Sequence, residues 1–279
     1  MKKYIINKSK NIGNVIFVVE GGRAETGGTE LRVLKKIFAD ILGYEVQELR
    51  RGSDEFICHG VNSQYHVFAL NLPKNQLTQL NEDSLDLLFQ RLRDDFHVKP
   101  EDCPIFLLYD RDVLSYKSFV FKSNYVMKYT DPYGTDTGDQ GQLLISYPSI
   151  ESYLLSCIKD NTIDCSCKLG RDAKSLLTCE ICPDDSINKS DIHNETVNLV
   201  FSDNVSEAEE RLIHAVKEMD NGLVRMEFSS YDLDNLAPLL ISVYNYEQNK
   251  YKIEGSFSFI SLVSMALLEL GVIDAIDDV

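Results

Sequence analysis

"VIFVVEGGRAETGGTELRVL" (residues 15–34) passes from an apolar run through a glycine-rich segment into a helical pattern. The run from 14 to 19 is continuous and rich in β-branched residues, which is typical of a strand covered on both faces. From Thr29 onward, apolar residues recur every three or four positions and form the stripe of an amphipathic helix, which Gly43 is placed to end. This order of strand, glycine-rich loop and helix predicts an α/β unit. Glu20 lies where the strand ends.

A second apolar strand repeats this pattern further along the chain. The segment CPIFLLYD (103–110) again closes on an acid, Asp110. Strand patterns also lie at 44–49, 65–70 and 143–146, and helical patterns lie at 81–96 and from about Pro148. Strands that alternate with helices predict a mainly parallel sheet flanked by helices.

The strand signal fades beyond residue 155. Helical patterns at 206–219, 232–248 and 258–271 dominate the rest, and Pro238 is expected to kink or restart the second of them. We therefore expect an α/β domain at residues 1–155, followed by a mostly helical domain at residues 156–279.

The composition is that of an ordinary globular protein, with 44% apolar and 26% charged residues among 279. No signal peptide and no membrane-spanning segment are expected, since the most apolar late stretch, of about 15 residues, is too short to cross a bilayer. Seven cysteines, an odd number, argue against a secreted disulfide framework and predict a reducing cytoplasm. The net charge of −16 repels phosphate at long range, so either the partner is not a nucleic acid, or the contact is local and helped by metal ions or a basic partner.

Acidic residues follow both apolar strands. Glu20 ends the first, and Asp110 ends the second, with Asp112 two residues further on. Sites in open parallel sheets form outside the carboxyl ends of the strands. Three carboxylates converging there would repel one another unless a cation lay among them, and hard oxygen ligands of this kind suit Mg²⁺ or Mn²⁺. The alternative is that each acid only caps a neighbouring loop.

These residues resemble the Toprim domain, which is shared by topoisomerases, bacterial primases, recombination proteins and the overcoming-lysogenization-defect nucleases. The Toprim pattern is a glutamate–glycine pair after the first strand and Asp-x-Asp after a later one, which Glu20-Gly21 and Asp110-x-Asp112 match as they stand. The segment YPSIESYLL (147–155) is similar to a helix of Toprim proteins encoded beside ABC-type ATPases in phage-defence loci. The resemblance covers roughly residues 14–158.

The resemblance implies a role for each matched side chain. Glu20 would act as general base or acid near the attacked phosphate and contribute to the metal site, with a second acid beside it. Glu30, which opens the helix, is the choice for that second acid, and Glu25 is the other candidate. Two divalent metal ions held by such acids would stabilise both the attacking and the leaving oxygen of a phosphodiester.

The remaining roles implied by the resemblance concern the metal and the phosphate. Asp110 and Asp112 would hold a divalent ion, and Glu151 would complete that site or add a second one. Lys174 would be the basic residue that overcoming-lysogenization-defect nucleases use in the same crevice.

Four cysteines lie within 18 residues, as C-x-C and C-x-x-C on either side of a predicted helix at 169–177: Cys165, Cys167, Cys179 and Cys182. Four thiolates could make a closed tetrahedral Zn²⁺ site. The C-x-C half is tighter than zinc sites usually are, and reduced cysteines without metal are the favoured interpretation.

The sequence therefore predicts a Mg²⁺- or Mn²⁺-dependent Toprim nuclease that hydrolyses DNA or RNA, tRNA included, in the cytoplasm. The resemblance implies the effector of an antiphage system with a separate ABC-type ATPase, and a homodimer is compatible with it. The alternative is a catalytically silent Toprim-like scaffold that binds a partner protein, which the acidic surface and the loose spacing of the second acid favour.

Overall fold

The computed structural model describes residues 2–20, 28–49, 55–60, 66–72, 82–111, 121–134, 139–182, 189–228 and 230–277. The chain divides into two compact units, each built from segments that are separate in the sequence. The central unit comprises Asn11–Leu108 and Ser123–Leu143, and the terminal unit comprises Met1–Lys10, Tyr109–Lys122 and Leu144–Val279. The boundary predicted at residue 155 stays a prediction.

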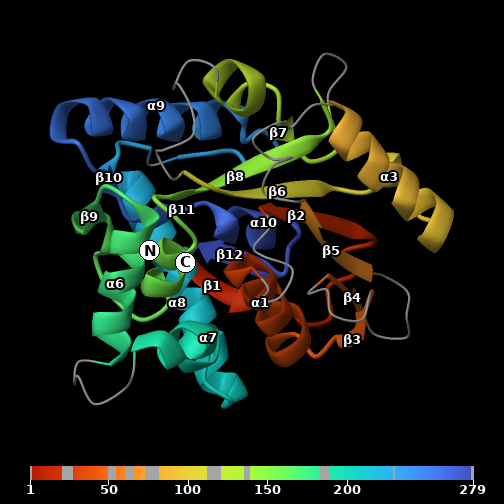
Figure 1. Cartoon of the computed structure of the whole chain (residues 1–279), viewed down its shortest axis with the longest axis horizontal. Coiled ribbons are helices and arrows are strands. Elements are labelled where there is room, and N and C mark those ends of the chain that lie inside the picture. The colour runs from red at the N-terminus through yellow and green to blue at the C-terminus, as the bar shows by residue number, and fades with distance from the viewer. Residues whose placement is uncertain are drawn as a thin grey trace. The chain divides into compact units, whose positions relative to one another are not determined.

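The first part of the chain alternates strands and helices (Figure 1). Its elements are β1 (Lys2–Ile6), β2 (Val15–Glu20), α1 (Thr29–Lys35), η1 (Lys36–Ile41), β3 (Glu45–Glu48), β4 (Phe56–His59), β5 (His66–Leu72), α3 (Glu82–Phe96), η3 (Pro100–Asp102), β6 (Ile105–Asp110), η4 (Lys122–Val126), β7 (Thr130–Asp131) and β8 (Gly141–Tyr147).

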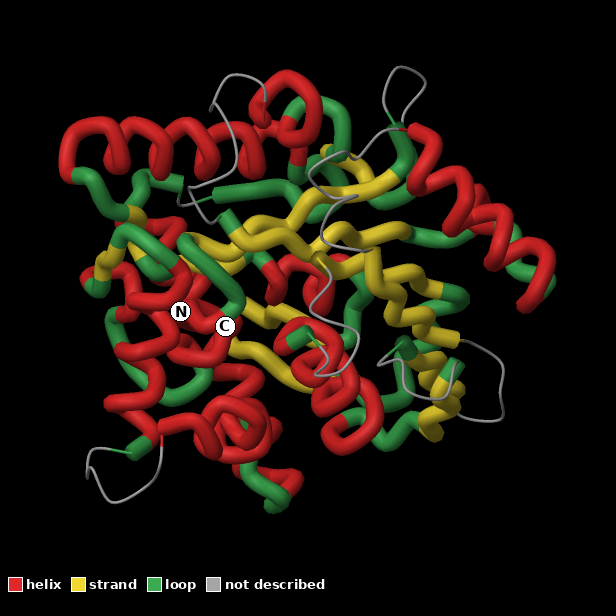
Figure 2. The backbone as a smooth tube through the Cα atoms, in the orientation of Figure 1, coloured by secondary structure: helices red, strands yellow, loops and turns green. Residues whose placement is uncertain are grey.

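The second part is mostly helical; Figure 2 draws its helices, like those of the first part, in red. Its elements are α5 (Glu151–Ser156), η5 (Thr162–Asp164), β9 (Ser166–Cys167), α6 (Gly170–Ile181), α7 (Lys189–Val200), α8 (Val205–Arg225), α9 (Ala237–Glu254), β10 (Phe257–Ser258), β11 (Ile260–Ser261), α10 (Val263–Glu269) and β12 (Ile273–Asp277).

The main sheet is mixed, in the strand order β11-β8-β6-β2-β5-β4-β3, with β7 paired to β8. β2 is parallel to both of its neighbours: Val18 pairs with Leu70 of β5 on one side and with Leu107 of β6 on the other. The β4–β5, β3–β4 and β11–β8 pairs are antiparallel. The predicted α/β class is confirmed, with the parallel strands at the centre of the sheet.

The strand predicted at 14–19 is β2, which lies in the core of the central unit. Val15–Val19 are fully buried, and the ring of Phe17 lies 5.3 Å from that of Phe106 and 5.6 Å from that of Phe38, measured between centroids. The helix predicted from Thr29 is α1, continued by the π-helical turn η1. Gly43 ends it as predicted, with a φ of 76° and its N–H donated to the carbonyl of Ala39.

The helix predicted at 258–271 is wrong in its first part. Residues 257–261 instead form two short strands, in which Ser258 pairs with Ser166 and Ser261 pairs with Ser146. Only Val263–Glu269 is helical. Pairing with β8 and β9 satisfies the backbone of this apolar segment, and such tertiary pairing overrides the helical periodicity.

The two ends of the described chain pair with each other. β1 and β12 form a two-stranded antiparallel ladder in which Tyr4 is opposite Ala275, and they lie side by side in Figure 1. Pro238 lies in the first turn of α9. The helix therefore starts at this proline and is not kinked by it, which is one of the two outcomes predicted for Pro238. No helix in the described ranges is both long and apolar enough to cross a membrane.

Candidate functional site

Asp110 ends β6, and its carboxylate is fixed to the start of α5. The backbone N–H of Ile150 donates a hydrogen bond to Oδ1 of Asp110 at 2.8 Å. The first N–H groups of a helix lack partners within the helix, and a carboxylate there is favoured by the helix dipole. The end of β6 is therefore held against the residue that directly precedes Glu151.

Glu151 is a buried acid with a cation beside it. The residue is 6% exposed. The hydroxyl of Ser149 donates to its Oε2 at 2.6 Å, and Nζ of Lys174 lies 3.8 Å from its Oε1. Lys174 belongs to α6, which packs against α5. A buried carboxylate requires partners of this kind, and the pair brings two of the predicted site residues together.

Arg111 fixes the chain just beyond Asp110. Its N–H donates to the carbonyl of Ser146, and its side chain is only 2% exposed. The guanidinium donates to Oε1 of Gln248 at 3.2 Å and lies 4.7 Å from the ring centroid of Phe121. A planar cation over an aromatic face is favourable, and more so when both are shielded from water. Arg111 was not singled out from the sequence, where nothing distinguishes it from a surface arginine.

Another buried acid, Glu247, lies on α9. It is 0% exposed, and its Oε2 accepts a hydrogen bond from the N–H of Ser258 at 3.0 Å. Its Oε1 has no hydrogen-bond partner. Burial raises the pKa of Glu247 from 4.5 to about 7, because an apolar environment disfavours the ionised form. Nearby, burial also raises the pKa of Tyr147 well above its usual value.

The other predicted acids belong to the central unit or lie outside the described residues. Glu20 is the last residue of β2, whose Val19 pairs with Leu108 of β6. Glu30 is buried in the first turn of α1. Asp112 and Glu25 lie outside the described residues.

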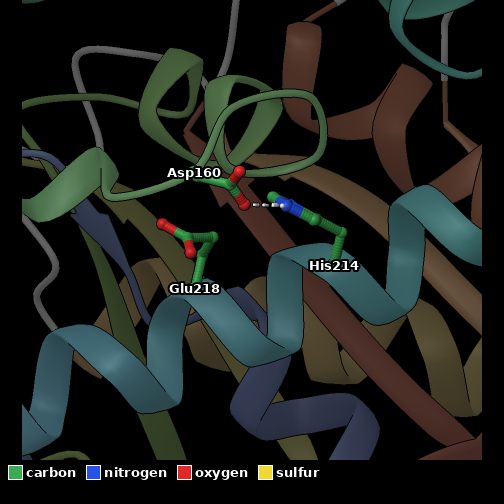
Figure 3. Close-up of side chains that lie close together, drawn as sticks. All are labelled: Asp160, His214 and Glu218. Atoms are coloured by element: carbon green, nitrogen blue, oxygen red, sulfur yellow. Dashed lines mark hydrogen bonds and ion pairs between the residues drawn. The ribbon is translucent and has the colours of Figure 1, made fainter.

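The structure also groups three residues that the sequence analysis did not (Figure 3). Among the described residues, one set of three His, Cys, Asp or Glu side chains has its ligand atoms within 4.8 Å of one another: Asp160, His214 and Glu218. His214 and Glu218 are four residues apart on α8, which places them on one helix face. This four-residue spacing, within the helix predicted at 206–219, was the signal in the sequence that could have indicated the pair.

The four clustered cysteines are not gathered in this way. Among the described residues, none of the four forms a disulfide bond, and no three of their sulfurs form a metal-ligand group. Cys165 and Cys167 lie before α6, whereas Cys179 and Cys182 lie at its far end. Burial raises the pKa of Cys165, which disfavours the thiolate that Zn²⁺ would require.

Asp110 and Glu151 are of the ligand type that a hard cation prefers. Asp110 and Glu151 supply carboxylate oxygens, and Lys174 supplies a positive charge that can pair with a carboxylate or with a phosphate. Comparison with protein-family models, with curated proteins and with solved structures found no match.

Proposed function

We propose that this chain is a nuclease of the Toprim type that uses Mg²⁺ or Mn²⁺ to hydrolyse phosphodiester bonds in DNA or RNA, with tRNA as one candidate substrate. The observation that carries the proposal is the arrangement at the end of β6. Asp110 is bound to the N–H of Ile150, and the next residue, Glu151, is buried with Lys174 3.8 Å away. An acid pair with an adjacent cation is suited to a phosphate and its counter-ion.

Asp110, Asp112 and Glu151 would hold the ion, which would supply a positive charge against the oxygens of the attacked phosphate. Lys174 would exchange its contact with Glu151 for one with a phosphate oxygen, since its side chain is 37% exposed and can reach solvent. Ser149 and the N–H of Ile150 keep the two acids in place during this exchange.

Glu20 would take the proton of the attacking water or return one to the leaving oxygen, with Glu30 as the second acid. The support is the sequence pattern: Glu20 ends β2 and is followed by Gly21, as in the glutamate–glycine pair of the Toprim pattern.

The proposal extends to an antiphage system in which a separate ABC-type ATPase assists the nuclease. The net charge of −16 supports a basic partner, because this chain alone repels nucleic acid at long range. Adding an ABC-type ATPase encoded by a neighbouring gene should then increase the cleavage rate, and the increase should shrink at high salt.

A second candidate is a catalytically silent scaffold that binds a partner protein. It is favoured by the fact that Ile150, Ser149 and Lys174 already provide Asp110 and Glu151 with partners without any metal.

One assay separates the two candidates. The purified chain is incubated with plasmid DNA and with total tRNA, in millimolar Mg²⁺ or Mn²⁺ and then with EDTA. The nuclease predicts cleavage that EDTA abolishes. Intact substrates under every metal condition, with the ATPase present as well as absent, would support the scaffold.

A further inference from the structure

The three residues on α8 and after α5 combine a histidine with two carboxylates in the terminal unit (Figure 3). His214 and Glu218 face the turn that carries Asp160, and α5 and α8 are in contact. Asp160 is well exposed, with 82% of its side chain accessible, whereas Glu218 is only 6% exposed. The group therefore joins a buried acid to the surface through the histidine.

The hydrogen bonds of His214 determine which ring nitrogen faces Asp160. Nδ1 lies 2.6 Å from the carbonyl oxygen of Ser156, which can only accept, so Nδ1 carries a hydrogen. Nε2 lies 2.9 Å from Oδ1 of Asp160, to which it donates a hydrogen bond when the ring is protonated, and in the neutral ring its lone pair is available to a metal ion placed between the two. A histidine whose other nitrogen donates to a backbone carbonyl has the arrangement found for metal-ligating histidines.

Glu218 is a buried carboxylate with neutral partners only. Its Oε2 accepts the N–H of Thr162 at 2.9 Å and the hydroxyl of the same residue at 3.3 Å, and its Oε1 is 3.4 Å from Nδ2 of Asn221. In the described ranges, no lysine or arginine forms an ion pair with it. Buried charges are paired or coordinate a metal, so a carboxylate with this environment points to a cation as its missing partner.

We propose that Asp160, His214 and Glu218 form a Zn²⁺ site that ties α8 to the turn after α5. One imidazole and two carboxylates suit zinc, with water in the fourth position, whereas Mg²⁺ favours oxygen ligands and keeps several waters. The donor atoms need to approach one another to about 3.3 Å for zinc bond lengths, and the exposed Asp160 can move inward to achieve this.

The test uses the full chain, stripped with EDTA and desalted, in thermal unfolding and in calorimetric titration with Zn²⁺ or Mg²⁺. Zn²⁺ should raise the melting temperature of the wild type in a concentration-dependent way. Asp160→Asn should weaken Zn²⁺ binding by roughly tenfold or more, and His214→Ala should abolish it. Glu210→Gln, which removes an exposed acid from the same helix, should bind Zn²⁺ like the wild type.

The cysteines provide the competing source of zinc binding, so the double variant Cys179→Ser with Cys182→Ser is titrated in parallel. It should bind Zn²⁺ like the wild type. Because His214 also caps the carbonyl of Ser156, Asp160→Asn decides the matter if His214→Ala fails to fold. The proposal is overturned by a wild type that does not bind Zn²⁺, by Zn²⁺ binding that is unchanged in Asp160→Asn, or by binding that is lost in the cysteine variant.

Discussion

Two acidic regions of the terminal unit differ in what neutralises their buried carboxylates. Glu151 has the ammonium group of Lys174 at 3.8 Å, and that lysine is accessible to solvent. In the described part of the chain, Glu218 receives N–H and O–H donors from neutral residues only. In the proposed nuclease the first region would release its lysine to an incoming phosphate, and in the proposed zinc site the second region would hold a cation that stays. The two proposals thus give the same residue type a role in turnover in one place and a structural role in the other.

Glu247 differs from both Glu151 and Glu218, because its charge is removed by protonation. Among the described residues it has neither an ion-paired cation nor a full set of hydrogen-bond donors, and burial raises its pKa to about 7. Protonation therefore removes its charge at the lower end of the physiological pH range.

The largest effect is expected at Asp110. Asp110→Asn should reduce cleavage roughly a hundredfold or more, because it removes a charged metal ligand. The amide oxygen can still accept the N–H of Ile150, so the melting temperature of the metal-free variant should stay within a few degrees of the wild type or rise slightly. Cleavage assays beside thermal unfolding check this. A variant that loses activity only because it unfolds would remove Asp110 from the metal site.

Glu247 should make stability depend on pH. The pKa of Glu247 is about 7 in the folded protein and 4.5 for an unperturbed glutamate, which represents the unfolded chain. Between these two pH values Glu247 is protonated in the folded state and ionised in the unfolded state. The free energy of unfolding should therefore fall as the pH rises from about 4.5 to 7, by on the order of 3 kcal/mol, and level off above. Glu247→Gln should lack this fall in urea unfolding at pH 5 and pH 8, whereas the exposed control Glu210→Gln should retain it. An identical pH dependence in both variants would contradict the assignment.

Lys174→Ala should have a smaller effect on stability. The loss leaves Glu151 buried without its cation, but Lys174 is partly exposed and the expected cost is about 1 kcal/mol. If Glu151 binds Mg²⁺, millimolar Mg²⁺ should stabilise this variant more than it stabilises the wild type. Lys168→Ala, an exposed lysine before the same helix, serves as control. Equal stabilisation of all three proteins by Mg²⁺ would show that Glu151 does not bind the metal.

The smallest effect is expected at the cysteines. Cys179→Ser with Cys182→Ser should leave both the zinc content and the melting temperature unchanged, because the four sulfurs are not gathered into a ligand group. Elemental analysis of protein purified without added metal measures the zinc. A fall in zinc in this variant would restore the four-thiolate site that the spacing allowed.

The sequence predicted secondary structure best where the pattern of apolar residues was clear and a glycine marked the end of the element. The run at 14–19 and the helix ended by Gly43 were both predictable, since burial on two faces and a positive φ each leave a clear pattern. The segment at 258–271 was not, because its first residues are paired with β8 and β9, which lie far away in the sequence. β1 and β12 were missed for the same reason.

The candidate site was predictable only in part. Acids at strand ends can be read from the sequence, but the contact of Lys174 with Glu151 depends on how α6 packs against α5. Arg111 and Asp160 gave no local signal at all. Their roles follow from neighbours such as Gln248 and His214, which are more than 50 residues away along the chain.

The most direct test of the central claim is the cleavage rate of the Glu151→Gln variant under saturating Mg²⁺, relative to the wild type and to Asp172→Asn. Asp172 is an exposed acid on α6, two residues from Lys174, and serves as the matched control. If Glu151 is a ligand of the proposed metal site, the wild type and Asp172→Asn should cleave the substrate, and EDTA should abolish this cleavage. The cleavage rate of Glu151→Gln should be at least roughly a hundredfold lower than that of the wild type. Cleavage by Glu151→Gln at the wild-type rate, or cleavage by the wild type that EDTA does not affect, would contradict it.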